Sequence, residues 1–268
     1  MASESSIEWT ELTWNPTTGC TKISPGCKHC YAEVMAGRLH AMGAPGYRNG
    51  FQLAILPERL EQPLQRKKAT VYFVNSMSDL FHEDIPDQFL DQVFSVIRRT
   101  PQHTYQILTK RAERLPEYFK NRGCPKNVWL GVSVEDRHYG VPRIDYLRQI
   151  DAHIRFLSVE PLLEDVGEMD LAGIHWVIVG GESGPKARPM KPEWVESVKQ
   201  QADEAGAAFF FKQWGGWGAD GVKRHKKANG RIFLGRTWDA YPALSLRTAR
   251  AIFEASPLAA GFGLDTAR

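Results

Sequence analysis

The sequence predicts an α/β fold with parallel strands, arranged either as a partial or complete β/α barrel or as a doubly wound open sheet. Short runs rich in β-branched and aromatic residues alternate along the chain with amphipathic stretches of helical period. Most of these candidate strands are separated by enough residues to hold a crossover helix, which parallel neighbours require. We therefore expect repeated strand–helix units around one sheet.

Seven segments carry the strand pattern. The first is short and lies near residues 11–14, and the others span 70–74, 104–108, 128–134, 154–159, 174–179 and 207–211. Helices are expected at 31–39, 87–99 and 192–205. The last of these begins with proline in its first turn and ends at Gly206, the usual asymmetry of helix ends.

Composition places the chain among ordinary globular proteins, with 268 residues, 43% of them hydrophobic and 24% charged. No apolar run is long enough for a membrane span, and the first residues lack the basic and apolar parts of a secretory signal. We expect a cytoplasmic protein without a membrane partner. Residues 1–215 would form the cysteine loop and barrel, and residues 216–268 a basic flap, a short helix near 245–254 and a tail packed on the same domain.

Three of the four cysteines, Cys20, Cys27 and Cys30, lie within eleven residues, whereas Cys124 is remote. Three thiolates crowded in one loop repel one another unless a metal neutralises them, so the spacing C-x6-C-x2-C predicts a metal site. Zinc would need a fourth ligand, from Cys124 or from His29, which adjoins a ligand. A four-iron cluster on three thiolates would instead leave one iron open to a cofactor or substrate.

Polar residues follow the candidate strands, at the edge where the carboxyl ends of parallel strands form the site face. These residues are, in chain order, Asn75, Ser76, Ser78, Asp79, Thr109, Lys110, Glu135, Asp136, Glu160, Glu182, Ser183, Lys212 and Gln213. We expect them to converge on one site, although any one of them would also suit an ordinary polar loop.

Eight segments together resemble the phage and bacterial three-Cys-motif protein family over nearly the whole chain. They are TWNPTTGC (13–20), SPGCKHCYAE (24–33), VNSMSDLFHEDIP (74–86), ILTKR (107–111), LGVSVE (130–135), SVEPLL (158–163), VGGESG (179–184) and FFFKQWG (209–215). That family is regarded as similar to the radical S-adenosylmethionine (SAM) superfamily. The superfamily's usual cluster motif is C-x3-C-x2-C with an aromatic residue before the last cysteine. Here the first gap holds six residues, and His29 occupies the aromatic position.

The resemblance implies a radical SAM type barrel in which Cys20, Cys27 and Cys30 hold a 4Fe–4S cluster whose open iron chelates SAM. An external electron donor would drive cleavage of SAM to methionine and a 5′-deoxyadenosyl radical, which takes a hydrogen atom from the substrate. The resemblance also suggests a partner protein encoded nearby. The family's Gly-Gly-Glu follows the second barrel strand, whereas Gly180, Gly181 and Glu182 follow a later one, so that role is not transferred.

Around such a cluster, the loop and the strand ends would supply the remaining groups. The expected cofactor-binding residues are His29, Tyr31, Asn75, Ser76, Asp79, Lys110, Glu135, Glu160, Gly180, Gly181 and Glu182, and the expected catalytic residues are His82, Lys212 and Gln213. His82 would act as a proton donor, and the cations would meet the SAM carboxylate or a substrate phosphate. Structural ion pairs and a tight turn at the two glycines are the alternatives.

The segment after residue 213 interleaves aromatic residues with cations, and residues 201–268 carry ten Lys and Arg against six Asp and Glu. This mixture suits stacked bases and phosphates, so we expect a nucleic acid or nucleotide substrate, in repair or modification. The expected substrate-binding residues are Trp214, Trp217, Lys223, Arg224, Lys226, Lys227, Arg236 and Trp238. A lid whose aromatic residues pack inward is the alternative. A zinc-dependent nucleic-acid-binding module and an iron–sulfur sensor remain open as functions.

Overall fold

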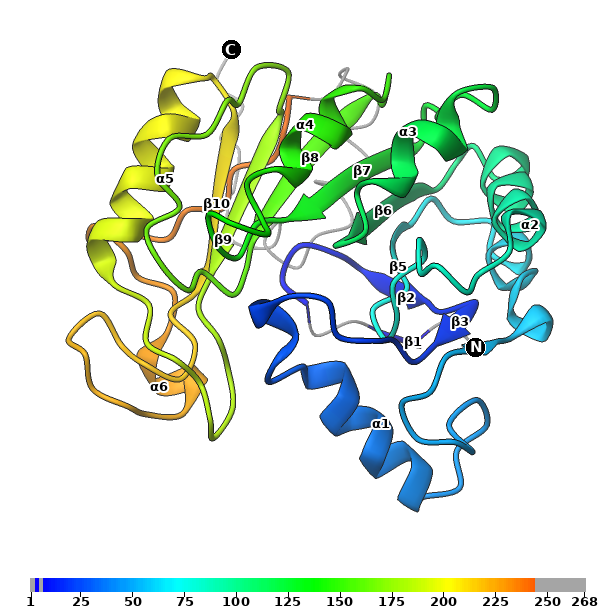
Figure 1. The fold of residues 1–268 in the computed structure, drawn as a ribbon, viewed down its shortest axis with the longest axis horizontal. Helices are drawn as coiled ribbons and strands as arrows, with labels where there is room; N and C mark the ends of the chain where they lie inside the picture. The colour runs from blue at the N-terminus through cyan, green and yellow to red at the C-terminus, as the bar shows by residue number, and fades with distance from the viewer. Residues whose placement is uncertain (1–2, 5–6, 244–268) are drawn as a thin grey trace, which may run out of the picture.

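The computed structural model describes residues 3–4 and 7–243. Its centre is an eight-stranded sheet in which the strands follow one another in chain order, curled into a half-barrel (Figure 1). The strands are β1 (Ser3–Glu4), β2 (Leu12–Trp14), β5 (Val71–Val74), β6 (Thr104–Thr109), β7 (Val128–Ser133), β8 (Ile154–Val159), β9 (Trp176–Gly180) and β10 (Ala208–Gln213). Strand β1 is antiparallel to β2, and all later neighbours are parallel.

All seven strands expected from the sequence are present, which confirms the α/β fold with parallel strands. The doubly wound alternative is wrong, because that architecture reverses the strand order at a switch point and this sheet does not. Among the described residues β2 and β10 do not pair, so the barrel is partial. The helix expected near 245–254 and the tail lie outside the described residues.

Helices α2 to α5 cover the convex face of the sheet, while α1 and α6 lie apart from it (Figure 1). The helices are α1 (Tyr31–Ala41), α2 (Asp87–Arg99), α3 (Arg114–Phe119), α4 (Arg143–Arg148), α5 (Pro192–Glu204) and α6 (Lys226–Asn229). Strands β3 (Thr17–Thr18) and β4 (Ala54–Ile55) form a separate small sheet, and 3-10 turns span Pro25–Cys27, Pro57–Arg59 and Gln62–Gln65. None of the described helices is long and apolar enough to cross a membrane.

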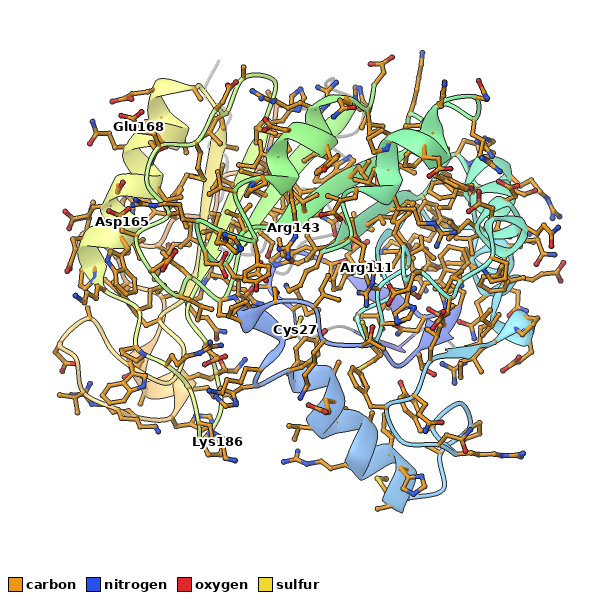
Figure 2. The ribbon with its side chains drawn as sticks, in the orientation of Figure 1. Cys27, Arg111, Arg143, Asp165, Glu168 and Lys186 are labelled. Atoms are coloured by element: carbon orange, nitrogen blue, oxygen red, sulfur yellow. The ribbon has the colours of Figure 1, made fainter. Side chains whose placement is uncertain are left out.

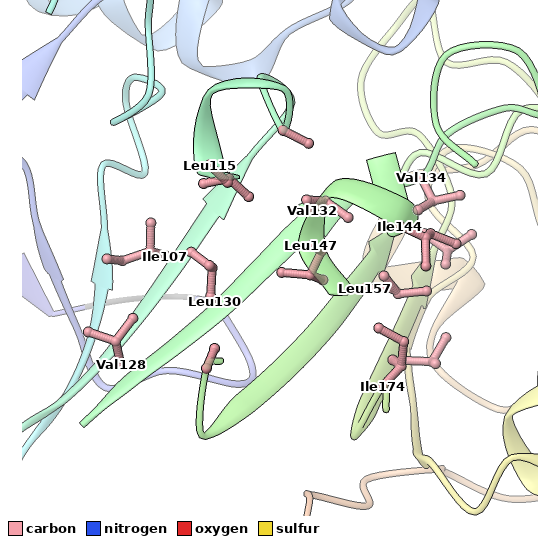
Figure 3. Close-up of a cluster of buried hydrophobic side chains, with 14 of the residues drawn as sticks. Ile107, Leu115, Val128, Leu130, Val132, Val134, Ile144, Leu147, Leu157 and Ile174 are labelled. Carbon is pink, nitrogen blue, oxygen red and sulfur yellow. The ribbon is translucent and has the colours of Figure 1, made fainter. Parts of the chain in front are cut away.

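The outer core lies between the sheet and its helices. Figure 3 shows Ile107, Leu130 and Leu157 of the strands facing Leu115 of α3 and Leu147 of α4, and all five side chains are buried. The two helices hold only six residues each, and the sequence analysis did not predict them. Their leucines are the packing that fixes the strand ends from outside.

The concave face of the sheet is filled at one end by aromatic side chains. These are Trp9, Phe73, Trp129, Phe156, Trp176 and Phe210, which form a buried cluster separate from the outer core. A Cβ at Gly131 would lie 2.5 Å from the Phe156 ring, so glycine is needed there. Because side chains alternate along a strand, Ser133 and Ser158 lie on this same face one step nearer the carboxyl ends, with Glu135 and Glu160 beyond them. The interior thus changes from aromatic to small to charged towards the strand ends.

Candidate functional site

The cysteine loop starts beside the carboxyl end of β5. The Gly19 N–H donates to the Met77 carbonyl at 3.0 Å, and Ser78 Oγ donates to the Gly19 carbonyl at 2.7 Å. Gly19 has a φ of +78°, and a Cβ there would lie 2.1 Å from the Gln52 carbonyl oxygen. Only glycine fits such a position, which fixes where the loop leaves the β3–β4 sheet.

Arg111, just beyond β6, anchors the first part of the loop. Its guanidinium is nearly buried, donates to the Thr21 carbonyl at 3.1 Å and to Thr21 Oγ1 at 2.7 Å, and has its Nη1 3.4 Å from Cys20 Sγ. The carboxylates of Asp79 and Glu83 accept from the same guanidinium at 3.3 and 2.6 Å. From the sequence, Arg111 is expected, like Lys110 and Lys212, to meet the SAM carboxylate or a substrate phosphate, whereas its contacts in the structure hold the cysteine loop.

His82 also holds the first part of the cysteine loop, through Thr21. Its Nδ1 accepts from the Asp84 N–H at 3.1 Å, so Nε2 carries the proton and donates to Thr21 Oγ1 at 2.9 Å. Burial and the Arg111 charge lower the pKa of His82 below its usual 6.5, so the ring is neutral near pH 7. The ring is wholly buried and engaged at both nitrogens, which suits a loop support better than the expected proton donor.

Glu135, at the end of β7, anchors the middle of the loop. Its carboxylate is fully buried, accepts from Ser24 Oγ, and pairs with Arg143 of α4 at 2.6 Å. Burial opposes ionisation of Glu135, but Lys110, Arg143 and the Ser24 hydrogen bond hold its pKa below the usual value. A Cβ at Gly26 would lie 2.8 Å from this side chain, so loop and carboxylate are packed together.

Arg188, in the loop after β9, anchors the turn that carries Cys27. The Glu182 carboxylate accepts from the Arg188 N–H at 2.8 Å, from its Nε at 2.9 Å and from its Nη2 at 2.5 Å. The same Nη2 donates to the Pro25 carbonyl at 3.1 Å. No sequence motif singled out Arg188. The six residues between the first two cysteines therefore run past the strand ends from β6 to β9 and are held at three points. This path accounts for the long gap between Cys20 and Cys27.

The three clustered cysteines lie on this anchored loop, and all are partly exposed free thiols. In the view of Figure 2, Cys27 lies between the strands of the sheet and helix α1. Cys30 occupies the position before the first residue of α1, where the helix dipole favours a negative charge. Burial and Asp79 raise the pKa of the Cys20 thiol to about 11 despite Arg111, so a metal must displace that proton to bind.

The surroundings of the three thiols bear on the choice between the two metals that the sequence leaves open. Among the described residues no three His, Cys, Asp or Glu side chains gather closely enough to surround one ion, which a structural zinc site needs. In a 4Fe–4S cluster each thiolate binds a different iron, so the sulfurs stand further apart than the ligands of one ion. Three thiols on one loop, one of them beside an arginine N–H, match the number of protein ligands of a 4Fe–4S cluster with one open iron.

Several charged and polar side chains lie together at the carboxyl ends of the parallel strands. We call this end of the sheet the mouth of the half-barrel. Lys212 Nζ lies 2.9 Å from both carboxylate oxygens of Glu160, and Gln213 Nε2 lies 3.5 Å from Glu160 Oε1 and 3.1 Å from Ser183 Oγ. Lys110 lies close enough to Glu135 to lower the pKa of its carboxyl. The sequence analysis expected these charged groups to converge, and the structure brings them to one face.

Other expected cofactor-binding residues are already engaged within the fold. The Asn75 amide donates to Thr17 Oγ1 at 2.7 Å, and the Asp79 carboxylate accepts from the Lys110 N–H at 2.9 Å in addition to Arg111. A Cβ at Gly181 would lie 2.0 Å from the Trp214 carbonyl oxygen, so the glycine accommodates the next strand's turn rather than an adenine. Gly180 packs closely against Glu160, because a Cβ at Gly180 would lie 3.1 Å from the Cδ atom of Glu160.

Two residues next to the cysteines have different surroundings. The Tyr31 hydroxyl donates to the Ser76 carbonyl, so α1 is tied to the end of β5 at its first residue. His29 is partly exposed between Cys27 and Cys30. Both adjoin Cys30 in the chain, and their expected contact with a cofactor stays a prediction.

Two tryptophans that were expected to bind the substrate are packed within the fold instead. Trp214 is buried against Phe211 and Phe233, and its indole N–H donates to the Ile232 carbonyl, so it belongs to the core and not to a substrate surface. Trp238 lies between two cations, with Arg236 at 3.6 Å and Lys199 at 4.1 Å from its ring centre.

The rest of the flap is split between pairing and exposure. Lys223 donates to the Pro185 carbonyl and lies over the Trp217 ring, whose N–H donates to Ala187 at 2.7 Å. Arg224 pairs with Asp220 at 2.6 Å. Lys226 and Lys227 of α6 are exposed. Of the expected substrate-binding set, these two lysines are the ones the structure leaves most open to a polyanion.

Comparison with known proteins returned solved structures and one family. Spore photoproduct lyase complexed with dinucleoside spore photoproduct is 13% identical with a TM-score of 0.45, and a variant of that lyase with bound AdoMet and the same dinucleoside gives the same identity and score. Each comparison covers 76% of this chain, which spans 64% of the lyase chain. No curated protein matches the sequence. A family model described as a protein of unknown function, DUF5131, matches residues 4–242, so the chain belongs to the DUF5131 family.

Proposed function

We propose that this protein is a radical SAM type enzyme whose Cys20, Cys27 and Cys30 hold a 4Fe–4S cluster at the mouth of the half-barrel. The observation that carries the proposal is the anchoring of the cysteine loop. Arg111, Glu135 and Arg188 come from three different strand ends and each bonds a different part of it. A loop that was only a surface connection would not need three largely buried charged anchors.

When bound, such a cluster supplies one electron to SAM and yields methionine and a 5′-deoxyadenosyl radical that takes a hydrogen atom from the substrate. The protein's own part is to bind, orient and exclude water. Lys110 and Lys212 offer cations for the SAM carboxylate, and Glu160 offers an acceptor for an ammonium group or a ribose hydroxyl. Ser133 and Ser158 are small, buried side chains between the aromatic cluster and the charged strand ends, and they would let a cofactor approach the sheet more closely than large residues would.

The substrate class rests on the rim of the mouth. Lys226 and Lys227 are exposed on α6, and Lys186 lies at the tip of the loop that faces α1 (Figure 2). Three cations on one lobe beside the mouth suit a phosphate-bearing substrate, and we propose a nucleic acid or a nucleotide, in repair or modification. An external one-electron donor completes the scheme.

The test is a SAM cleavage assay on protein reconstituted anaerobically with iron and sulfide. Reduction with dithionite should release 5′-deoxyadenosine and methionine, measured by chromatography, from the wild type and from Cys124→Ala but not from Cys27→Ala. A protein that carries a full cluster and releases no 5′-deoxyadenosine would contradict the enzymatic proposal and favour an iron–sulfur sensor. A colourless protein with zinc would favour the binding module.

A further inference from the structure

Helix α1 carries most of its larger apolar side chains on the outside. Its covered side is made of Ala32 and Ala36, which are buried, and of Leu39, which packs partly buried against the same cluster. Val34, Met35 and Met42 at its end are 57%, 41% and 79% exposed. A surface helix normally shows the opposite pattern, with large residues on the core side. No part of the chain that the structure describes therefore covers the exposed side of α1.

These exposed residues share one stripe. At 100° per residue, positions 31, 34, 35, 38 and 42 fall within about a third of the helix circumference. Four of the five are apolar, and the spacing i, i+3, i+4 is the pattern by which a helix face docks into a groove. Methionine side chains adapt their shape and are enriched at protein interfaces. We call this set, Tyr31, Val34, Met35, Arg38 and Met42, the α1 stripe.

The segment of the chain that carries the α1 stripe is mainly basic. Residues 20–50 contain Lys22, Lys28, Arg38 and Arg48 but one acidic residue, Glu33, which pairs with Lys22 at 2.7 Å. A partner matched to this surface has an apolar centre and an acidic rim. A nucleic acid would satisfy the cations but would gain nothing from valine and methionine in the centre, so the surface favours an acidic protein.

The position of the stripe indicates what such a protein would deliver. Its first residue, Tyr31, directly follows Cys30, so a protein seated on the stripe lies against the cysteine loop. We propose that the α1 stripe is the docking surface for a small acidic electron-carrier protein, an inference that rests on the proposed function. One electron passes from the reduced carrier to the oxidised cluster, and no covalent bond forms or breaks.

The experiment measures electron transfer separately from catalysis. A flavodoxin in its hydroquinone form is mixed in stopped flow with the reconstituted protein, and flavin oxidation is followed together with bleaching of the cluster. The double variant Val34→Glu/Met35→Glu and the charge reversal Arg38→Glu should each slow both signals at least tenfold, and raised salt should slow the wild type. The matched control is Ile232→Glu, a similarly exposed apolar site at 58% that lies outside α1, just after α6, and this variant should transfer electrons at the wild-type rate.

Dithionite distinguishes a failure of the docking surface from a failure of the proposed function, because it is a small reductant that needs no docking surface. The stripe variants should keep dithionite-driven SAM cleavage, whereas a wild type that fails with dithionite would sink the proposed function itself. Unchanged flavodoxin rates in both stripe variants would overturn the docking proposal. So would a wild-type dimer in light scattering that Arg38→Glu dissociates, or weaker substrate binding by the stripe variants under dithionite. If the double variant binds no iron, the flavodoxin rate of Arg38→Glu decides whether the α1 stripe is the docking surface, because the Arg38 side chain lies on the exposed side of the helix.

Discussion

The Nη1 atom of Arg111 lies 3.4 Å from the Sγ atom of Cys20, and the same guanidinium bonds the next residue of the loop. A cation that touches a cysteine sulfur stabilises the thiolate form and fixes its position at once. Cys20 is thereby held by a residue just beyond β6, although Cys20 lies about ninety residues earlier in the chain.

Arg111→Ala should lower iron binding and stability together. Removing this nearly buried cation leaves the carboxylate of Asp79 without its ion partner, which costs about 3 kcal/mol or more. Iron content after reconstitution and urea unfolding check the two effects. Arg137→Ala, on a side chain that is 62% exposed, should change neither. Full iron content in Arg111→Ala would contradict the anchoring role.

Gly26→Ala should displace the loop from Glu135. The new Cβ would lie 2.8 Å from a carboxylate that Arg143 holds in place, so the glutamate cannot move aside easily. We expect a loss of about 1 to 3 kcal/mol in stability and reduced iron content. Gly37→Ala is the matched control in α1, since a Cβ there meets nothing within 4 Å, and it should stabilise the helix by up to about 1 kcal/mol.

His82 should contribute a pH dependence of stability just below neutrality. Its pKa in the folded protein is below 6.5, so below that pH the unfolded chain takes up a proton that the folded chain resists, and stability falls. His82→Gln keeps an N–H for Thr21 and removes the titration. The urea midpoint of the wild type, relative to this variant, should be constant from pH 8 to 7 and should decrease between pH 6.5 and 5.5. Parallel curves through that range would show that the ring titrates normally.

The flap residues should separate into two classes. Lys226→Ala and Lys227→Ala should leave stability unchanged but weaken binding of a DNA oligonucleotide and reduce its salt dependence, because each removes one phosphate contact. Trp214→Ala should instead cost about 3 to 5 kcal/mol of stability, since its side chain is 3% exposed. Fluorescence anisotropy at several salt concentrations and thermal unfolding distinguish the two. Salt-independent binding by the wild type would argue against a polyanionic substrate at this rim.

The sequence predicted what local pattern determines. Helix α2 begins and ends where its period of buried residues does, and all seven parallel strands follow their β-branched and aromatic runs. Helices α3 and α4 were not predicted, because six residues are too few to establish a helical period of apolar residues. The convergence of polar strand ends followed from parallel topology alone.

Contacts between distant segments were beyond sequence reasoning. Arg188 has no motif, and its role depends on the Pro25 carbonyl 163 residues away. Trp214 lies in a glycine-rich, basic segment that reads as a surface flap, yet the aromatic side chains of Phe211 and Phe233 bury it. The glycine at 26 would have been a clue to a close approach, but nothing in the sequence says that Glu135 is the neighbour.

The central claim is that three thiolates of one anchored loop hold an iron–sulfur cluster, and metal analysis tests it most directly. Iron, zinc and acid-labile sulfide are measured per chain on protein reconstituted without oxygen, for the wild type and for alanine variants of each of the four cysteines. The account predicts about four irons and four sulfides in the wild type and in Cys124→Ala, and loss of both in Cys20→Ala, Cys27→Ala and Cys30→Ala. One zinc per chain without sulfide, or loss of the metal in Cys124→Ala, would contradict it.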